Sequence, residues 1–144
     1  MNFSKEENKK LIEQYPFLLP HNRWTDEVPQ NYDYSYTELI DFPDGWFKAF
    51  GKEMLEELKE ELIKHDYLYD FRIMQIKEKY GGLRFYTGLV PKDSKIFEII
   101  SDYEGKSYHH CMYCGQPAET DYSNYWIETI CDSCKKKRME KMFE

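Results

Sequence analysis

Residues 111–134 read CMYCGQPAETDYSNYWIETICDSC, and they contain all four cysteines of the 144-residue chain. The cysteines form two Cys-x-x-Cys pairs, Cys111 with Cys114 and Cys131 with Cys134. Zinc binds four thiolates in a tetrahedron with Zn–S distances of about 2.3 Å, and a two-residue gap lets one tight turn supply two of them. The spacing therefore predicts one Zn²⁺ ion. Because four thiolates leave no position for water or substrate, its role is expected to be structural.

Other uses of four cysteines are two disulfides, a redox-active pair or separate buried thiols. A thioredoxin-like site needs one Cys-x-x-Cys pair at the start of a helix and leaves the second pair unexplained. The chain begins MNFSKEE, without an apolar signal segment, which favours a reducing cytoplasm and metal-bound thiolates. His109 and His110 precede Cys111 and are alternative ligands, although four cysteines already complete a site.

The sequence around the two pairs predicts a zinc-finger module over residues 107–144. Gly115 follows the first pair, as in a zinc knuckle, where glycine permits a positive φ. Residues 125–130 have the composition of a strand, and residues 131–143 that of a helix which begins at the second pair. This order is similar to a treble-clef finger, and a zinc ribbon is the alternative.

Residues 1–106 are expected to form an α+β domain built from helices and one β-hairpin. Ser4 and Glu7 form a capping box before a predicted helix over residues 5–14. A long irregular stretch over residues 15–46 follows. It is too polar for a core and too aromatic for a free linker, so we expect it to wrap the domain or to line a groove.

Two further helices are predicted from the apolar pattern. Over residues 46–65, apolar side chains recur at steps of three and four residues, opposite a stripe of glutamates interpreted as a solvated face. Asp44 is the expected N-cap of this helix. A helix over residues 94–105 is expected to close the domain.

The segment FRIMQIKEKYGGLRFYTGL, residues 71–89, alternates around a Gly-Gly pair and predicts a β-hairpin over residues 71–90. A three-residue Tyr-Gly-Gly loop would place Glu78 opposite Arg84. A two-residue turn would instead place Lys79 opposite Arg84. Like charges that face each other are unfavourable, so the three-residue loop is favoured.

Two parts of the chain carry a family resemblance. They are QIKEKYGGLRFY at residues 75–86, and the Cys-x-x-Cys-Gly and Trp-Ile-x-Thr-x-Cys motifs at residues 111–115 and 126–131. The chain resembles a family of small uncharacterised proteins of bacteriophages and bacterial mobile elements, and residues 15–46 are similar to the longer, phage-type members. The resemblance implies a zinc-bearing accessory protein in the cytoplasm of an infected host. It carries no catalytic residues over to this chain.

The chain has a formal net charge of -7, which argues against simple nucleic-acid binding, because such proteins present a basic face to the phosphates. One basic run is the candidate surface of a nucleic-acid-binding regulator: Lys135, Lys136, Lys137 and Arg138. Its alternative role is a solvated helix face that offsets the charge of a Zn(Cys)₄ centre. No apolar run approaches the ~20 residues of a membrane span.

The acidic, aromatic-rich composition predicts a binding protein rather than an enzyme. We expect it to engage a host protein, as an antagonist of a host defence would, or to sequester a small nucleotide. For a nucleotide, cations would meet the phosphates and aromatic rings would stack on the base; the candidates are Arg84, Arg72, Lys77, Lys79, Tyr86 and Trp24. A salt bridge with Glu78 is the alternative role of the hairpin cations.

Catalysis is the lesser alternative. Asp70, Gln75 and Lys77 match the acidic and Gln-x-Lys pattern of a metal-dependent nuclease, but no second carboxylate is placed beside them in the sequence. The four histidines have no companion serine or reactive cysteine. The identity of the partner and the oligomeric state stay open.

Overall fold

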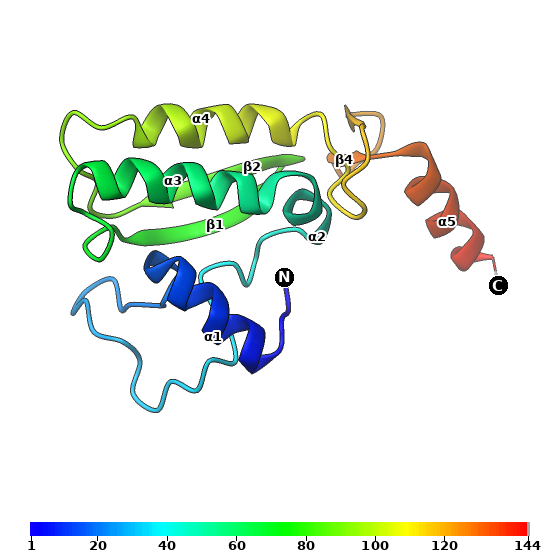
Figure 1. Cartoon of the computed structure of the whole chain (residues 1–144). Coiled ribbons are helices and arrows are strands. Elements are labelled where there is room, and N and C mark those ends of the chain that lie inside the picture. Colours follow the sequence, from blue (N-terminus) through cyan, green and yellow to red (C-terminus); the bar gives the residue numbers. More distant parts are fainter. Residues whose placement is uncertain (144) are drawn as a thin grey trace.

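The computed structural model describes residues 1–143 and combines five α-helices with two small antiparallel sheets. The elements in chain order are α1 (Lys5–Gln14), η1 (Pro16–Leu18), α2 (Asp44–Trp46), η2 (Phe47–Gly51), α3 (Lys52–Lys64), β1 (Ile73–Lys79), β2 (Gly82–Thr87), α4 (Ile96–Ser107), β3 (Glu119–Asp121), β4 (Glu128–Ile130) and α5 (Asp132–Met142). Helices α3 and α4 lie side by side against the β1–β2 hairpin (Figure 1). Helix α5 projects from the opposite end of the molecule to the α3–β1 connection (Figure 1). The predicted α+β class is confirmed.

Helix α1 begins and ends where the sequence predicted. The Ser4 hydroxyl donates to the Glu7 carboxylate at 3.0 Å, and the Glu7 backbone N–H donates to Ser4 Oγ at 3.2 Å. The second bond satisfies a backbone donor of the first helical turn, so Ser4 is the N-cap. The Glu7 carboxylate accepts from the Ser4 hydroxyl instead of the Ser4 backbone N–H of a full capping box. Local hydrogen bonding therefore sets the start of this helix.

The aromatic stretch after α1 wraps the domain and supplies part of its core. Its buried apolar side chains are Tyr15, Phe17, Leu18, Leu39, Phe42 and Trp46. The Phe17 ring packs edge to face against Phe71, with 5.6 Å between the ring centroids. Asn8 of α1 is 2% exposed, and its amide donates to the carbonyl of Tyr34 at 2.8 Å. The stretch is thus fastened at several points along its length.

The predicted helix over residues 46–65 is built from three stretches, α2, the π-helical turn η2 and α3. The prediction that Asp44 is the N-cap is wrong, because Asp44 is the first residue of α2 and no side chain caps this helix. Instead, the backbone N–H of Gly45 donates to the carbonyl of Met112 at 2.9 Å. A residue of the C-terminal finger therefore satisfies a donor in the first turn of this helix.

The glutamate stripe of α3 is not the purely solvated face that was expected. The hydroxyl of Tyr15 donates to Glu56 at 2.6 Å, and the hydroxyl of Tyr103 donates to Glu57. Burial, followed by the hydrogen bond to Glu56, raises the pKa of Tyr15 to about 12. Glu61 is 7% exposed, and its carboxylate accepts the backbone N–H just before α4 at 2.8 Å. These acids fasten α3 to its neighbours.

The β1–β2 hairpin is present, but both predicted registers are wrong. Its turn has two residues, Tyr80 and Gly81, with φ of 53° and 82°. Lys77 therefore faces Arg84, and the expected pairing of Glu78 with Arg84 does not form. Two successive residues in the left-handed region are typical of a type I′ turn, whose twist matches that of a hairpin.

Contacts with distant residues hold the turn in this register. A Cβ on Gly82 would lie 2.4 Å from the Tyr108 side chain, so this glycine belongs to the strand and not to the turn. The Glu78 carboxylate accepts the backbone N–H of Gly81 at 2.7 Å, and the Thr129 hydroxyl donates to the Gly81 carbonyl at 2.7 Å. These contacts outweigh the facing of two cations across the strands, which costs about 0.2–1 kcal/mol.

The register divides the hairpin into a buried face and an exposed face. Ile76, Leu83 and Phe85 lie on the buried face with exposed fractions of 1%, 0% and 6%. Helix α4 also covers the outer edge of β2, because Glu104 accepts the Phe85 N–H at 3.1 Å and Ser107 accepts the Leu83 N–H at 2.9 Å. An edge strand whose donors are satisfied in this way cannot pair with another chain.

The C-terminal segment is joined to the rest of the chain by buried contacts. The Trp46 indole donates to the His110 carbonyl at 2.8 Å, and Met112 belongs to the main core with an exposed fraction of 8%. A Cβ on Gly45 would lie 2.1 Å from the Cys111 carbonyl oxygen. The division into domains at residues 106 and 107 stays a prediction. Within residues 1–143, no helix is both long and apolar enough to cross a membrane.

Candidate metal centre and hairpin surface

The four predicted metal ligands come together. The sulfur atoms of Cys111, Cys114, Cys131 and Cys134 all lie within 4.8 Å of one another, and the Cys114 and Cys131 sulfurs are 3.6 Å apart. A tetrahedron with metal–sulfur distances of about 2.3 Å has sulfur–sulfur edges of about 3.8 Å. Disulfide sulfurs would be bonded at about 2.05 Å, so the separation fits a shared metal ion and not a disulfide.

Local backbone geometry explains how the two pairs converge. Gly115 has a φ of 84°, and its N–H donates to the Cys111 carbonyl at 2.9 Å, which closes the first pair into a knuckle. Cys131 is the N-cap of α5, and its sulfur accepts the N–H of Cys134 at 3.4 Å. Of residues 125–130, which were expected to form a strand, only those of β4 do so, Glu128–Ile130. Knuckle, hairpin and helix follow one another in the order of a treble-clef finger.

The pKa values of two thiols in this cluster are shifted in opposite directions. Burial opposes ionisation of Cys111, but hydrogen bonds from the backbone N–H groups of Cys131, Cys114 and Tyr113 lower the pKa of its thiol to about 7. Burial, hydrogen bonds with the other sulfurs and the negative charge of Cys111 raise the pKa of Cys134 to about 12. A bound metal ion would compensate the repulsion between neighbouring thiolates in this cluster. An all-thiolate tetrahedron is a donor set that suits zinc.

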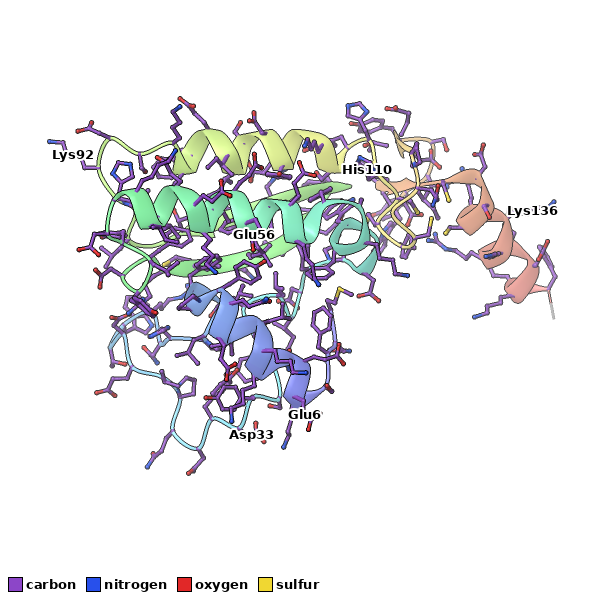
Figure 2. The ribbon with its side chains drawn as sticks, in the orientation of Figure 1. Glu6, Asp33, Glu56, Lys92, His110 and Lys136 are labelled. Carbon is purple, nitrogen blue, oxygen red and sulfur yellow. The ribbon has the colours of Figure 1, made fainter. Side chains whose placement is uncertain are left out.

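Two histidines next to the knuckle do not belong to this group. His109 Nδ1 lies 3.1 Å from the Glu119 carboxylate, and His110 Nδ1 lies 3.1 Å from the Gly115 carbonyl oxygen. His110 packs edge to face against Phe50. Figure 2 shows His110 at the junction between the helical body and the finger, beside the gathered sulfur atoms. Both histidines therefore support the knuckle from outside the thiol cluster.

The exposed face of the β1–β2 hairpin gathers four of the six predicted ligand-binding residues. We define the hairpin surface as Gln75, Lys77, Lys79, Arg84 and Tyr86, which the register places on one side of the two strands. Gln75 faces Tyr86, and Lys77 faces Arg84. Tyr86 is 45% exposed. The surface thus presents three cations beside an accessible aromatic ring.

Arg84 is held in place on the hairpin surface. Its guanidinium donates to the Tyr108 hydroxyl at 2.9 Å and to the Leu83 carbonyl at 3.3 Å. The hydrogen bond to Tyr108 raises the pKa of Arg84. Within residues 1–143, neither Arg84 nor the two lysines of the hairpin surface has a carboxylate at salt-bridge distance, so the alternative bridge to Glu78 does not form.

The other two predicted ligand residues lie elsewhere. Arg72 is at the open end of the hairpin, where its Nε donates to Asp26 Oδ1 at 2.6 Å and its Nη1 donates to the Tyr69 carbonyl at 2.7 Å. Trp24 lies on the loop that carries Asp26 and is 87% exposed. Neither residue shares a face with Lys77 and Arg84.

Ion pairs divide the basic run of α5. Lys135 pairs with Asp121 at 2.5 Å, and Arg138 forms two hydrogen bonds with the buried Glu128 carboxylate, at 2.6 Å and 3.0 Å. These two cations therefore stabilise the finger. Lys136 and Lys137 have no such partner in the described part of the chain; Figure 2 shows Lys136 on α5, well away from the helical body.

The nuclease-like constellation gains no support from its surroundings. Gln75 and Lys77 lie on the hairpin surface, whereas Asp70 is an exposed residue of the turn before β1. Over residues 1–143, the four cysteines form the single group of three or more His, Cys, Asp or Glu side chains placed to share a metal ion. Asp70 therefore has no partner carboxylates with which to hold a catalytic metal.

Tyr108 is a contributor to the hairpin surface that the sequence did not indicate. It follows α4 directly and lies 24 residues from the arginine that it holds. The one hint in the sequence is Gly82, the second glycine of the hairpin: a side chain at this position would collide with the Tyr108 ring. Nothing in the local pattern connects the two.

Comparisons with protein-family models, with curated proteins and with solved structures found no match for this chain.

Proposed function

We propose that this chain is a non-enzymatic zinc protein that holds a small nucleotide on the hairpin surface through the nucleotide's phosphates. The facing of Lys77 and Arg84 on an exposed sheet face carries this proposal. Two like charges in this position destabilise a hairpin by a few tenths of a kcal/mol to about 1 kcal/mol. A phosphate between them would convert this repulsion into two charge-assisted hydrogen bonds.

The neighbours of this cation pair suit the rest of a nucleotide. Tyr86 is the next residue along β2 on the same face, and its exposed ring offers a stacking surface for a base. The amide of Gln75, across from Tyr86, can both donate and accept hydrogen bonds at a base edge. Because Tyr108 orients Arg84 before any ligand arrives, little side-chain entropy is lost on binding.

The proposed zinc ion has a supporting role. It would hold the finger, whose Thr129 hydroxyl bonds to the Gly81 carbonyl in the turn of the larger hairpin. The family resemblance places such a protein among cytoplasmic accessory proteins of phages, where sequestering a nucleotide signal would antagonise a host defence. The same surface would serve if the partner were a host protein with an acidic or phosphorylated patch.

The decisive experiment is to purify the zinc-loaded protein from a bacterial host and identify every co-eluting nucleotide and protein by mass spectrometry. Candidate nucleotides are then titrated calorimetrically into the wild type and into the variants Lys77→Gln and Arg84→Gln. We expect each variant to weaken binding by about tenfold or more, because each loses one charge-assisted bond. Lys92→Gln, an exposed lysine outside the hairpin surface, is the matched control.

Two results would contradict the proposal. Nucleotides that bind the wild type and both variants equally would show that the hairpin surface is not the site. Absence of any co-eluting nucleotide, together with no heat of binding, would remove the nucleotide as ligand. A discrete host protein released by Lys77→Gln would keep the surface but change the partner.

Nucleic-acid binding by α5 is the second candidate. It is favoured by one observation: α5 has no buried side chain, and Lys136 and Lys137 project from it without carboxylate partners in the described residues. Reversing the charge of Lys136 should then abolish a salt-sensitive interaction with DNA or RNA. If the zinc-loaded protein binds neither at low salt, this candidate is eliminated.

A further inference from the structure

A groove lies at the open end of the β1–β2 hairpin, away from the turn. The groove has a volume of about 440 Å³ and is lined on one side by a loop that includes His21 and Arg23. The hairpin lines the other side with Ile73, Met74 and Leu89. This volume is in the range of small-molecule sites.

The loop that forms one wall is internally braced. The Asn22 side chain accepts the backbone N–H groups of Trp24 and Thr25 at 2.8 Å and 3.0 Å. The backbone N–H of Asn22 donates to the Glu27 carbonyl at 2.8 Å, which closes the loop on itself. The wall therefore exists before any ligand binds, which lowers the entropy cost of binding.

An ion pair joins this loop to the hairpin. Arg72 contacts Asp26 through two hydrogen bonds, of 2.6 Å and 3.2 Å, and the hydrogen bond from Arg72 lowers the pKa of the Asp26 carboxyl. Arg72 also bonds to the carbonyls of Tyr69 and Phe71. Its donors are committed to the protein, so Arg72 builds the wall of the groove and is not expected to bind a phosphate.

The charge of the lining selects the charge of a ligand. The ion pair of Arg72 and Asp26 is neutral, and Arg23 has no carboxylate at salt-bridge distance within residues 1–143. His21 is held by its Nδ1, which lies 2.8 Å from the Leu19 carbonyl oxygen. By the same formal count that gives the chain a net charge of -7, with histidine uncharged, the lining carries one net positive charge. A ligand with a single negative charge matches it.

The apolar part of the groove selects the body of the ligand. Ile73 forms a buried floor at 7% exposure, while Leu89 and Met74 are 56% and 39% exposed. Gly88 contributes no side chain, which leaves this floor low. Trp24 is exposed on the bracing loop, and no role in the core accounts for it. Water-exposed apolar surface costs about 25 cal/mol per Å², which a flat apolar ligand would recover.

We propose that this groove binds a small planar aromatic carboxylate, with the ring on the floor of Ile73, Met74 and Leu89 and the carboxylate at Arg23. This site is independent of the hairpin surface, because it uses neither Lys77 nor Arg84. Free aromatic acids and the C-terminal aromatic residue of a peptide share this chemistry. The experiment below distinguishes the two sources.

The test uses the zinc-loaded full chain and amide chemical shifts in ¹H–¹⁵N NMR spectra. The probes are 2-naphthoate, its neutral isostere 2-naphthamide, and N-acetyl-tryptophan as a mimic of a peptide C-terminus. We expect saturable shifts of amides in residues 21–26, 72–74 and 88–89 with 2-naphthoate. Binding of the amide should be about tenfold weaker, because it loses one charge-assisted contact. Tighter binding of N-acetyl-tryptophan than of 2-naphthoate would identify a peptide as the source.

Two exposed positions provide variants that are expected to fold. Arg23→Gln should weaken 2-naphthoate about tenfold and leave 2-naphthamide unchanged, so that the preference for the carboxylate disappears. Leu89→Asp should weaken both probes, and Lys92→Gln is the control that should change neither. The proposal is overturned if 2-naphthoate produces no saturable shifts, if both probes bind equally to the wild type, or if the shifts map to the hairpin surface instead.

Discussion

The two β-hairpins of this chain are stabilised in different ways. Strands β1 and β2 contain seven and six residues, and they bury four large apolar side chains in the main core. Strands β3 and β4 contain three residues each, and the cysteine pairs flank them on both sides. A two-stranded hairpin without such support is marginal in water. A hydrophobic core supports the first, and a cluster of four cysteines that could hold a metal ion, together with ion pairs, supports the second.

The two hairpins also meet, and the smaller one supports the larger. The Thr129 hydroxyl of β4 bonds to the Gly81 carbonyl in the β1–β2 turn, and Thr120 of β3 lies 2.8 Å from that hydroxyl. Tyr108, three residues before the first cysteine, lies over Gly82. Loss of the finger should therefore disturb the turn of the first hairpin but spare its buried face.

Metal removal is expected to have the largest effect. Chelation of zinc, or Cys131→Ser, should unfold residues 107–143, because metal binding to such sites is worth on the order of 10 kcal/mol. Hydrogen exchange should show loss of protection in β4 and α5, partial loss at Gly81 and retained protection in Ile76 and Phe85. Ser133→Ala, in the same Cys-x-x-Cys pair, is the control. Equal loss of protection in both hairpins would show that they are one cooperative unit.

Removal of a buried apolar side chain should instead destabilise the β1–β2 hairpin. Ile76→Ala is expected to lower the free energy of unfolding by about 3 kcal/mol, since it deletes a 1% exposed side chain from the core. Zinc content, measured by a colorimetric thiol-displacement assay, should stay at one equivalent. Gln75→Ala, the neighbour on the exposed face, should change stability by less than about 0.5 kcal/mol. Loss of zinc from Ile76→Ala would contradict the separation of the two supports.

The contact between the finger and the first helix is the next test. Gly45→Ala should destabilise the protein by about 2 kcal/mol, because the new Cβ would lie 2.1 Å from the Cys111 carbonyl oxygen. Gly105→Ala in α4 is the matched control, since no atom lies within 4 Å of its added Cβ. That substitution should stabilise the helix by about 1 kcal/mol. Thermal unfolding would compare the two, and equal melting temperatures would mean that the knuckle does not press on the helix.

The smallest expected effect is the pH dependence of stability, which should run in opposite directions near the two hairpins. Burial raises the pKa of Glu38, in the stretch that wraps the first hairpin, to about 7. Stability from this carboxyl is fully present below its unfolded pKa near 4.5 and is lost as pH rises toward 7. In the finger, hydrogen bonds from Arg138 lower the pKa of Glu128, so its contribution is present above that unfolded value and is lost as pH falls.

Glu38→Gln should remove the loss of stability that occurs as the pH rises toward 7. The wild type should lose about 1 kcal/mol more than the variant between pH 5 and pH 8, a figure reduced because the side chain is partly exposed. Urea unfolding at both pH values would measure the difference. A constant difference between the two proteins at pH 5 and pH 8 would show that Glu38 titrates at its ordinary pKa.

Predictability from sequence differed between the two hairpins. The four-cysteine cluster followed from spacing alone, since four cysteines in two pairs define the donor set wherever the strands begin. The register of the larger hairpin did not, because the like-charge rule, applied to Lys79 and Arg84, favoured a three-residue loop, whereas the structure pairs Lys77 with Arg84 across a two-residue turn. The deciding contacts come from Tyr108 and Thr129, which are remote in sequence from the turn that they fix.

The same distinction applies to the candidate binding residues. Alternation predicts that Lys77 and Lys79 share one face of β1 and that Arg84 and Tyr86 share one face of β2. The observed register brings the two pairs to the same face, whereas the favoured pairing of Glu78 with Arg84 would have put them on opposite faces. Arg72 and Arg138 were predicted to bind ligands or nucleic acid, yet each is engaged by a carboxylate, Asp26 and Glu128 respectively. Which carboxylate pairs with a cation depends on which segment folds against it, and the local sequence pattern does not predict that.

The sequence by itself determined the four-cysteine site, the N-cap at Ser4 and the apolar face of α3. Each depends on residues within one turn, one helix or one fixed ligand spacing. The tertiary structure decided the hairpin register, the fate of each cation and the groove beside Arg23. These depend on groups that lie from 10 to 48 residues apart in the sequence. Such contacts form only when burial of the common core brings the segments together.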